Sequence, residues 1–161
     1  MLHKVSIAGL TMDPASNTPI IILKSEEDEQ AVPIWIGLLE ATSIASALQN
    51  IKYERPMTHD LLKNFADALQ ISIVKVEVCD LKDNTFYARI YFVSKDKSFD
   101  IDARPSDAIA LALRAKTQIF VTEEVMSQAQ SFEIDKDIGD KEDWKEWLEK
   151  ITPEDFSRYR S

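Results

Sequence analysis

The sequence predicts an α+β fold, with a mixed or antiparallel sheet, three packed helices and a C-terminal helical appendage. Three observations favour this class. The chain has 161 residues, enough for one domain with its own core. Hydrophobic residues make up 45% of it, which is typical of a globular chain. Runs rich in β-branched residues alternate with stretches whose apolar residues recur at helical spacing.

The first third of the chain is predicted to be mostly strand. The dipeptide Asp13-Pro14 and the acidic run 26–29 are expected to form the turns. A helix is then expected to begin at Glu40, because apolar residues follow it at helical spacing. The small residues of this helix, from Ala41 to Ala47, would allow close packing on a sheet or on a second subunit. The predicted strands are residues 5–10, 19–24 and 31–36.

The middle of the chain predicts a second helix, a hairpin and a third helix. The second helix is expected from about His59 to Gln70, capped by Thr58. Its apolar side chains are predicted to form a buried stripe, made of Leu61, Leu62, Phe65 and Leu69. The turn 80–84 should close a hairpin between two long strands. The remaining predicted elements are strands 71–79, 85–93, 99–102 and 119–122 and a helix at 106–116.

The C-terminal segment has a different composition. Residues 123–161 contain 12 acidic and 6 basic residues, and the polar stretch 133–143 favours a boundary. An apolar helix face follows, made of Trp144, Trp147, Leu148 and Ile151. We therefore predict a domain at residues 1–130 and an acidic helical tail at residues 131–161.

Composition excludes several classes of function. The net charge of −9 disfavours binding of nucleic acid or anionic membranes through bulk electrostatics. No stretch approaches a membrane span, and the N-terminus lacks the pattern of a signal peptide. The single Cys79 excludes an internal disulfide, and we expect a cytoplasmic protein. Three glycines and two histidines are too few for a nucleotide-binding glycine loop or a three-histidine zinc site.

The densest charged cluster is residues 100–107. Asp100 and Asp102 are two residues apart on a predicted strand, so their side chains should project to the same side. Mg²⁺ is commonly held by one or two carboxylates with water and substrate phosphates, and Arg104 could bind a phosphate through two nitrogens. A structural interpretation is also open, because the helix dipole stabilises Asp107 in a first turn and Asp102 could pair with Arg104.

Two further clusters contain residues suited to catalysis. His59 is predicted near a helix N-terminus, where the dipole disfavours the imidazolium and a neutral ring could act as a general base or a metal ligand. It could also be an ordinary surface histidine. Glu40 shares a helix face with apolar residues, so we expect it to have a raised pKa or a partner, either Arg55 or Arg104.

Six stretches carry a family resemblance. They are Pro33-Ile34-Trp35-Ile36-Gly37, Glu40-Ala41, Arg55-Pro56, Thr58-His59-Asp60-Leu61, Phe86-Tyr87-Ala88 and Asp102-Ala103-Arg104-Pro105-Ser106-Asp107-Ala108-Ile109-Ala110-Leu111-Ala112. With these, the chain resembles the bifunctional nuclease family. The resemblance implies an α+β domain, nuclease activity towards DNA and RNA, and a homo-oligomer, for which we expect a dimer. Some members continue into a UvrB/UvrC-type helical motif, where this chain has Trp144–Ile151 instead.

Three hypotheses follow. The first is a nuclease assisted by Mg²⁺ or Mn²⁺, acting on nucleic acid. The second is a non-enzymatic module that binds a nucleotide, an RNA end or a protein. The third is structural, with the same charges forming ion pairs that hold helices together. Under the first, the predicted sets are His59, Asp60, Asp102 and Asp107 for catalysis, Arg55, Arg104, Thr58 and Ser106 for substrate, and Asp102, Asp107 and Glu40 for the metal.

Overall fold

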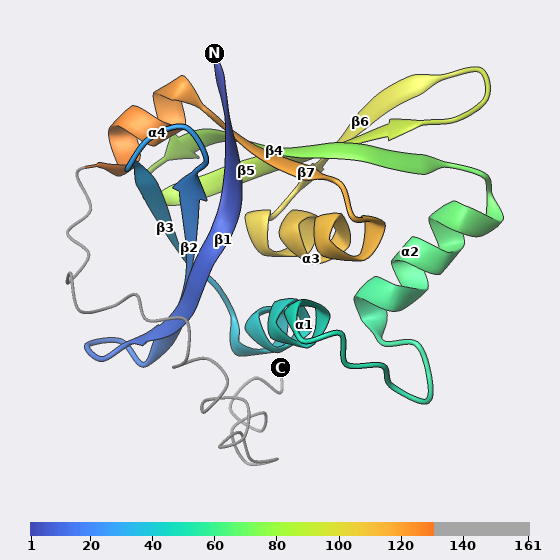
Figure 1. Cartoon of the computed structure of the whole chain (residues 1–161), viewed down its shortest axis with the longest axis horizontal. Coiled ribbons are helices and arrows are strands. Elements are labelled where there is room, and N and C mark those ends of the chain that lie inside the picture. Colours follow the sequence, from blue (N-terminus) through green and yellow to red (C-terminus); the bar gives the residue numbers. More distant parts are fainter. Residues whose placement is uncertain (131–161) are drawn as a thin grey trace.

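The core of the domain is built on a mixed sheet of seven strands. The structure is a computed structural model that describes residues 1–130. The strand order is β3-β2-β1-β7-β4-β5-β6 (Figure 1). Only the β4–β7 pair is parallel among these described strands, so the predicted mixed sheet is confirmed. The strands are β1 (Leu2–Asp13), β2 (Thr18–Ser25), β3 (Ala31–Trp35), β4 (Ser72–Lys82), β5 (Thr85–Val93), β6 (Ser98–Ala103) and β7 (Gln118–Thr122).

Four helices accompany the sheet within residues 1–130. They are α1 (Leu38–Leu48), α2 (Thr58–Ala68), α3 (Pro105–Ala115) and α4 (Glu123–Ala129). α3 lies beneath the middle of the sheet, α1 lies below α3, and α2 projects to one side (Figure 1). None of the helices in this part of the chain is long and apolar enough to cross a membrane.

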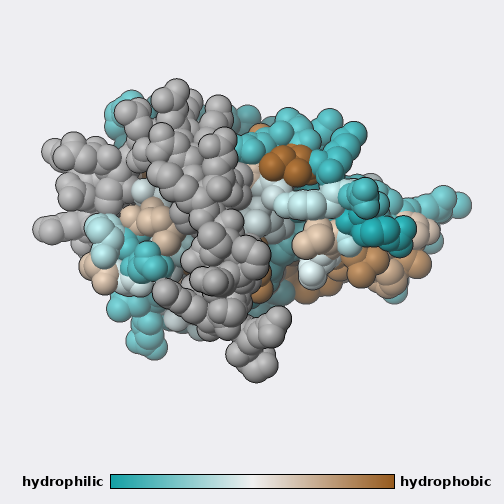
Figure 2. All heavy atoms as spheres, turned by 90° about the horizontal axis from the view of Figure 1, so that it is seen from below, coloured by the Kyte–Doolittle hydropathy of each residue, from teal (hydrophilic) through white to brown (hydrophobic). Residues whose placement is uncertain are grey.

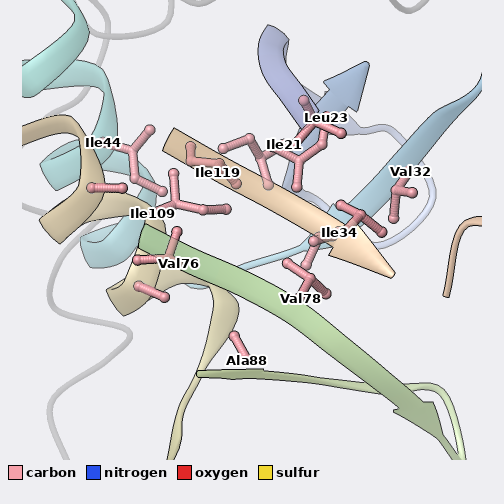
Figure 3. Packing of buried hydrophobic residues seen from close by; sticks show 14 of the residues in the cluster. Ile21, Leu23, Val32, Ile34, Ile44, Val76, Val78, Ala88, Ile109 and Ile119 are labelled. Carbon is pink, nitrogen blue, oxygen red and sulfur yellow. The ribbon is translucent and has the colours of Figure 1, made fainter. Parts of the chain in front are cut away.

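The core joins α1, α3 and one face of the sheet. Ile109 of α3 is fully buried and lies close to Ile44 of α1 and to the strand residues Val76 and Ile119 (Figure 3). Small residues on α3, such as Ala108 and Ala112, are also fully enclosed. Burial of this apolar surface is the main source of stability, and it fixes the position of α3 between the sheet and α1.

The β4–β5 hairpin closes more tightly than the sequence predicted. β4 continues to Lys82, so the loop contains only Asp83 and Asn84. Both have positive φ, 49° and 59°. Two positive φ values are those of a type I′ turn, whose twist matches the twist of the strands it joins. The expected turn at 80–84 was therefore three residues too long.

The predicted buried stripe of α2 is wrong. Leu61 is 62% exposed and Phe65 is 61% exposed, and Leu62 and Leu69 are also exposed. Ala66 is the one buried residue of this helix. Hydrophobic residues appear on the surface at the end of the molecule where α2 lies (Figure 2). Helical spacing identified an apolar face, but it carries no information about what that face contacts.

Two details near the helix termini also differ. Thr58 is the first residue of α2 rather than its cap, because Met57 occupies the cap position. Asp60 accepts a hydrogen bond from the backbone N–H of Met57 at 3.0 Å, which stabilises this terminus instead.

The short helix α4 was not predicted. The predicted tail helix and the boundary at 133–143 lie outside the described residues.

Candidate functional site

The candidate site lies where α1, α2 and α3 begin. Each of these helices has an acidic residue at its third position: Glu40, Asp60 and Asp107. Carboxylates are favourable there, because the backbone N–H groups of the first turn leave a partial positive charge. The core holds the helices close together, so three negative side chains are brought into one region. Basic side chains cross-link them.

Arg104 connects α1 to α3. Its Nη1 lies 2.9 Å from Glu40 Oε1, and its Nε donates to Asp107 Oδ2 at 3.0 Å. The prediction that Glu40 has an arginine partner is therefore confirmed, with Arg104 rather than Arg55. The hydrogen bond to Asp107 raises the pKa of the Arg104 guanidinium, which stays charged throughout the physiological range. Its side chain is nevertheless 66% exposed, so part of the guanidinium faces solvent.

His59 connects all three helices. Its Nε2 lies 2.8 Å from Asp107 Oδ1, and its Nδ1 lies 2.7 Å from Ser43 Oγ on α1. A carboxylate only accepts hydrogen bonds, so the tautomer that fits these contacts has its proton on Nε2 and accepts a hydrogen bond from the Ser43 hydroxyl at Nδ1. The His59 side chain is 11% exposed, which keeps these contacts largely away from bulk water.

Asp107 is held ionised by its two partners. The hydrogen bond from His59, and then that from Arg104, lowers the pKa of this carboxyl despite partial burial. Because the folded-state pKa is depressed, the pair stabilises the fold above the ordinary carboxyl pKa of about 3.9. This contribution is lost as the pH falls through the lowered value.

Arg114 braces the other side of the cluster. Its Nε donates to Asp60 Oδ1 at 2.7 Å, and its other nitrogens donate to the backbone oxygens of Ser43 and Ala110 at 3.3 and 2.9 Å. Burial alone would raise the pKa of Asp60, but the hydrogen bonds from Arg114 and Met57 lower it overall. The Arg114 side chain is 11% exposed. These contacts tie α2 to α1 and α3.

A cavity of about 620 Å³ opens onto this cluster. Its walls include the predicted site residues Glu40, Thr58, His59, Arg104 and Asp107. A second cavity, of about 510 Å³, also borders Arg104 and is lined by the buried Ser106 and by the more exposed Trp35 and Phe86. The structure therefore brings together five of the residues that the sequence singled out, and Arg104 borders both cavities.

Two predicted residues lie elsewhere. Arg55 is exposed in the loop before α2 and lines neither of the two cavities. Asp102 on β6 is directly opposite Arg89 on β5, so the two side chains share a face of the sheet. Ala88 and Ile90, on either side of Arg89, are buried in the core. Because neighbouring strand residues alternate between faces, Asp102 points away from the helices that carry Asp107.

The three predicted metal ligands do not all come together. Asp102 lies on the other face of the sheet from Asp107 and Glu40. Both carboxylate oxygens of Asp107 are already hydrogen-bonded, to His59 and Arg104. Among residues 1–130, no three His, Cys, Asp or Glu side chains are placed to hold a metal ion. The donor set expected for Mg²⁺ or Mn²⁺ therefore does not fit this geometry.

Three residues of the site were not predicted from the sequence to be site residues. Ser43 and Arg114 lie inside helices, where nothing in their spacing indicates that they meet His59 and Asp60. Gly37 is the cap residue of α1, and a Cβ atom there would collide with Glu40 Oε2. Its backbone φ of −73° can be adopted by any residue. Glycine is favoured here because a side chain would occupy the space of the Glu40 carboxylate.

We expect Gly37→Ala to displace the Glu40 carboxylate and break its contact with Arg104. The free energy of unfolding should change by no more than about 1 kcal/mol, because only the end of a flexible side chain must move. A crystal structure of the variant, with thermal unfolding, measures both effects. The matched control is Gly9→Ala, where nothing lies within 4 Å of the added Cβ. An unmoved Glu40 would contradict the expectation.

The two arginines should differ in their effect on stability. Arg114→Ala removes the donor to Asp60 Oδ1 and to the Ser43 carbonyl, and the lost side chain is only 11% exposed, so we expect a loss of about 2 kcal/mol. Arg104→Ala removes a mostly exposed side chain and should cost less than about 1 kcal/mol. Urea unfolding of both variants compares them. Equal losses would mean that Arg104 contributes as much to the free energy of unfolding as Arg114 does.

Comparison with known proteins gives a consistent result. The model of the bifunctional nuclease domain matches residues 21–133. An uncharacterized protein of Mycobacterium tuberculosis is 35% identical over 164 aligned residues, which cover 96% of this chain and 98% of that protein. Bifunctional nuclease 2 of Arabidopsis thaliana is 31% identical over 124 residues, covering 74% of this chain and 37% of the plant protein.

A third relative, Bifunctional nuclease 1 of Oryza sativa subsp. indica, is 23% identical over 70% of this chain and 35% of its own length. The chain therefore spans little more than a third of the plant proteins it matches. The matched domain contains α1, α2 and α3 together with every member of the Glu40–Arg104–Asp107–His59 cluster. The resemblance seen in the sequence is confirmed, and the chain belongs to the bifunctional nuclease domain family.

Proposed function

We propose that this protein hydrolyses phosphodiester bonds of DNA and RNA at the cavity beside Arg104, Asp107 and His59. The observation that carries the proposal is a histidine held between a carboxylate and a hydroxyl, next to a partly exposed guanidinium. Relatives named as bifunctional nucleases support the choice of substrate. This is the enzymatic hypothesis formulated from the sequence, with a different arrangement of residues.

Arg104 would bind the scissile phosphate. Glu40 and Asp107 engage its Nη1 and Nε, which fixes its orientation, while its side chain stays mostly exposed. A guanidinium held in this way matches the geometry of phosphate oxygens and stabilises negative charge that develops during the reaction. Thr58, on the wall of the same cavity, would offer a hydroxyl to the substrate.

His59 would act as the general base. Asp107 accepts a hydrogen bond from Nε2–H, which fixes the tautomer and leaves Nδ1 able to take a proton from the attacking oxygen. Asp60 would act indirectly, by anchoring Arg114 and the first turn of α2. No step is assigned to Mg²⁺ or Mn²⁺, because Asp102 lies away from Asp107 and Glu40.

A non-enzymatic role is the second candidate, and the charge of the chain favours it. A net charge of −9 provides poor attraction for a long polyanion, whereas a small anion needs only one oriented arginine. Under this reading the same cavity would bind a nucleotide or an RNA end without cleaving it. Turnover distinguishes the two functions, since a binding module shows saturable affinity without product.

Asp107→Asn should lower cleavage of labelled single-stranded DNA and RNA by at least about a hundredfold, because it removes the group that orients His59. The matched control is Asp102→Asn, which changes the same chemical group on the other face of the sheet and should keep wild-type activity. Rates are measured with Mg²⁺, with Mn²⁺ and with EDTA.

Several outcomes would change the assignment. Equal cleavage by wild type and Asp107→Asn would indicate a contaminating nuclease. A loss of activity confined to Asp102→Asn would move the site to the other face of the sheet. No cleavage by any protein, with saturable nucleotide binding, would favour the binding module.

We also propose that two copies of the chain associate through α2. This helix exposes an apolar face made of Leu61, Leu62, Phe65 and Leu69. On monomers, exposed apolar residues are usually scattered singly rather than gathered on one face. The charged pair on the same helix, Lys63 and Asp67, is internally neutralised by a 2.6 Å contact. Two such helices can therefore approach without repulsion between like charges, and each offers the other an apolar surface.

Phe65→Glu should shift the protein towards monomer in analytical ultracentrifugation, because it places a charge in the proposed contact. Tyr87→Glu is the control, since this exposed tyrosine lies on β5, away from α2, and should leave the mass unchanged. A monomeric wild type, or a dimer that survives Phe65→Glu, would refute the α2 interface.

A further inference from the structure

Ser43 differs from the other hydroxyl residues of α1. Thr42 and Ser46 donate to the backbone oxygens one turn earlier, Leu38 and Thr42, each at 2.8 Å. This is the common behaviour of such residues inside a helix. The Ser43 hydroxyl instead lies 2.7 Å from His59 Nδ1. Its polar contact is therefore directed away from its own helix and into the cluster.

The chain Ser43–His59–Asp107 has the order of a nucleophile, a base and an orienting carboxylate. The two contacts are 2.7 and 2.8 Å, and the residues come from α1, α2 and α3. Such a constellation is recognised by geometry and roles rather than by positions in the sequence. Here the Ser43 hydroxyl contacts Nδ1 and the Asp107 carboxylate contacts Nε2. The chemistry requires only that one ring nitrogen keeps its proton while the other accepts the proton of the hydroxyl.

The surroundings of Ser43 suit attack on a phosphate. Ser43 lines the 620 Å³ cavity together with Arg104 and Arg114, so two guanidinium groups border the same space. Asp60 and the Ser43 carbonyl engage Arg114, while Arg104 is partly exposed. A substrate phosphate bound to Arg104 would enter the cavity that Ser43 lines. Positive charge beside the attacked atom stabilises the transition state.

We infer that Ser43 is the nucleophile of this site and forms a covalent phosphoseryl intermediate. The inference rests on the proposed nuclease function for its substrate. His59 Nδ1 takes the Ser43 proton as Oγ forms a bond to phosphorus, and the bond from phosphorus to the leaving oxygen breaks. The leaving oxygen takes that proton from His59. Water then attacks phosphorus and gives a proton to His59. The Oγ–phosphorus bond breaks, and Ser43 Oγ takes that proton back from His59.

A biotinylated fluorophosphonate tests the nucleophile without requiring nuclease activity. Attack by Ser43 Oγ releases fluoride and leaves the phosphonyl group on the serine, which peptide mass spectrometry locates. We expect labelling of Ser43 in the wild type, none at this position in Ser43→Ala, and at least about a hundredfold slower labelling in His59→Ala. The control Ser127→Ala, on α4, should label as the wild type does. No label on Ser43 in the folded wild type would overturn the inference.

Cleavage kinetics separate this inference from the proposed function. Ser43→Ala should lower cleavage at least about a thousandfold, while its circular dichroism and thermal unfolding stay close to wild type, because alanine favours a helix interior. If Asp107→Asn loses activity but Ser43→Ala keeps it, the nuclease proposal stands and the Ser43 inference fails. If Ser43 is labelled but no nucleic acid is cleaved, the nucleophile stands and the nuclease proposal fails.

Discussion

Three helices begin close together in this domain, and each places a carboxylate in its first turn. Glu40, Asp60 and Asp107 favour their own helices individually, but together they concentrate negative charge in a partly buried region. Such groups are stable only when they are paired. Arg104, Arg114 and His59 provide the pairing, and each of these side chains connects different helices. The electrostatic requirement and the packing of the helices are therefore satisfied by the same contacts.

The hydrophobic core makes this arrangement rigid. α3 is enclosed by the sheet on one side and by α1 on the other, and Ile109 has no exposed surface. Because α3 cannot shift without opening the core, Arg104 and Asp107 at its start occupy fixed positions. Polar groups held by well-packed helices keep distances that a loop would not maintain. His59 and Arg114 depend most on this packing, since their side-chain contacts reach both of the other helices.

The structural and enzymatic hypotheses are compatible in this domain. Arg114 and Asp60 are engaged with each other and with the backbone, as the structural hypothesis expected. Arg104 pairs with Glu40 and Asp107, and His59 hydrogen-bonds Asp107, but both residues line a cavity and Arg104 is 66% exposed. A single network can thus hold the helices with one set of side chains and present another set to a substrate. Asp102 lies on the far face of the sheet and takes no part in this network.

The sequence by itself determined the α+β class, the order of most elements and the family, because local periodicity and short motifs are encoded within a few residues of one another. It also identified Glu40, His59, Arg104 and Asp107 as candidates. It did not determine the partners of these residues, the exposure of Leu61 and Phe65, or the face on which Asp102 lies. Those properties depend on contacts such as Ser43–His59 and on the registration of β5 with β6. Such contacts join segments far apart along the chain, so only the tertiary structure decided them.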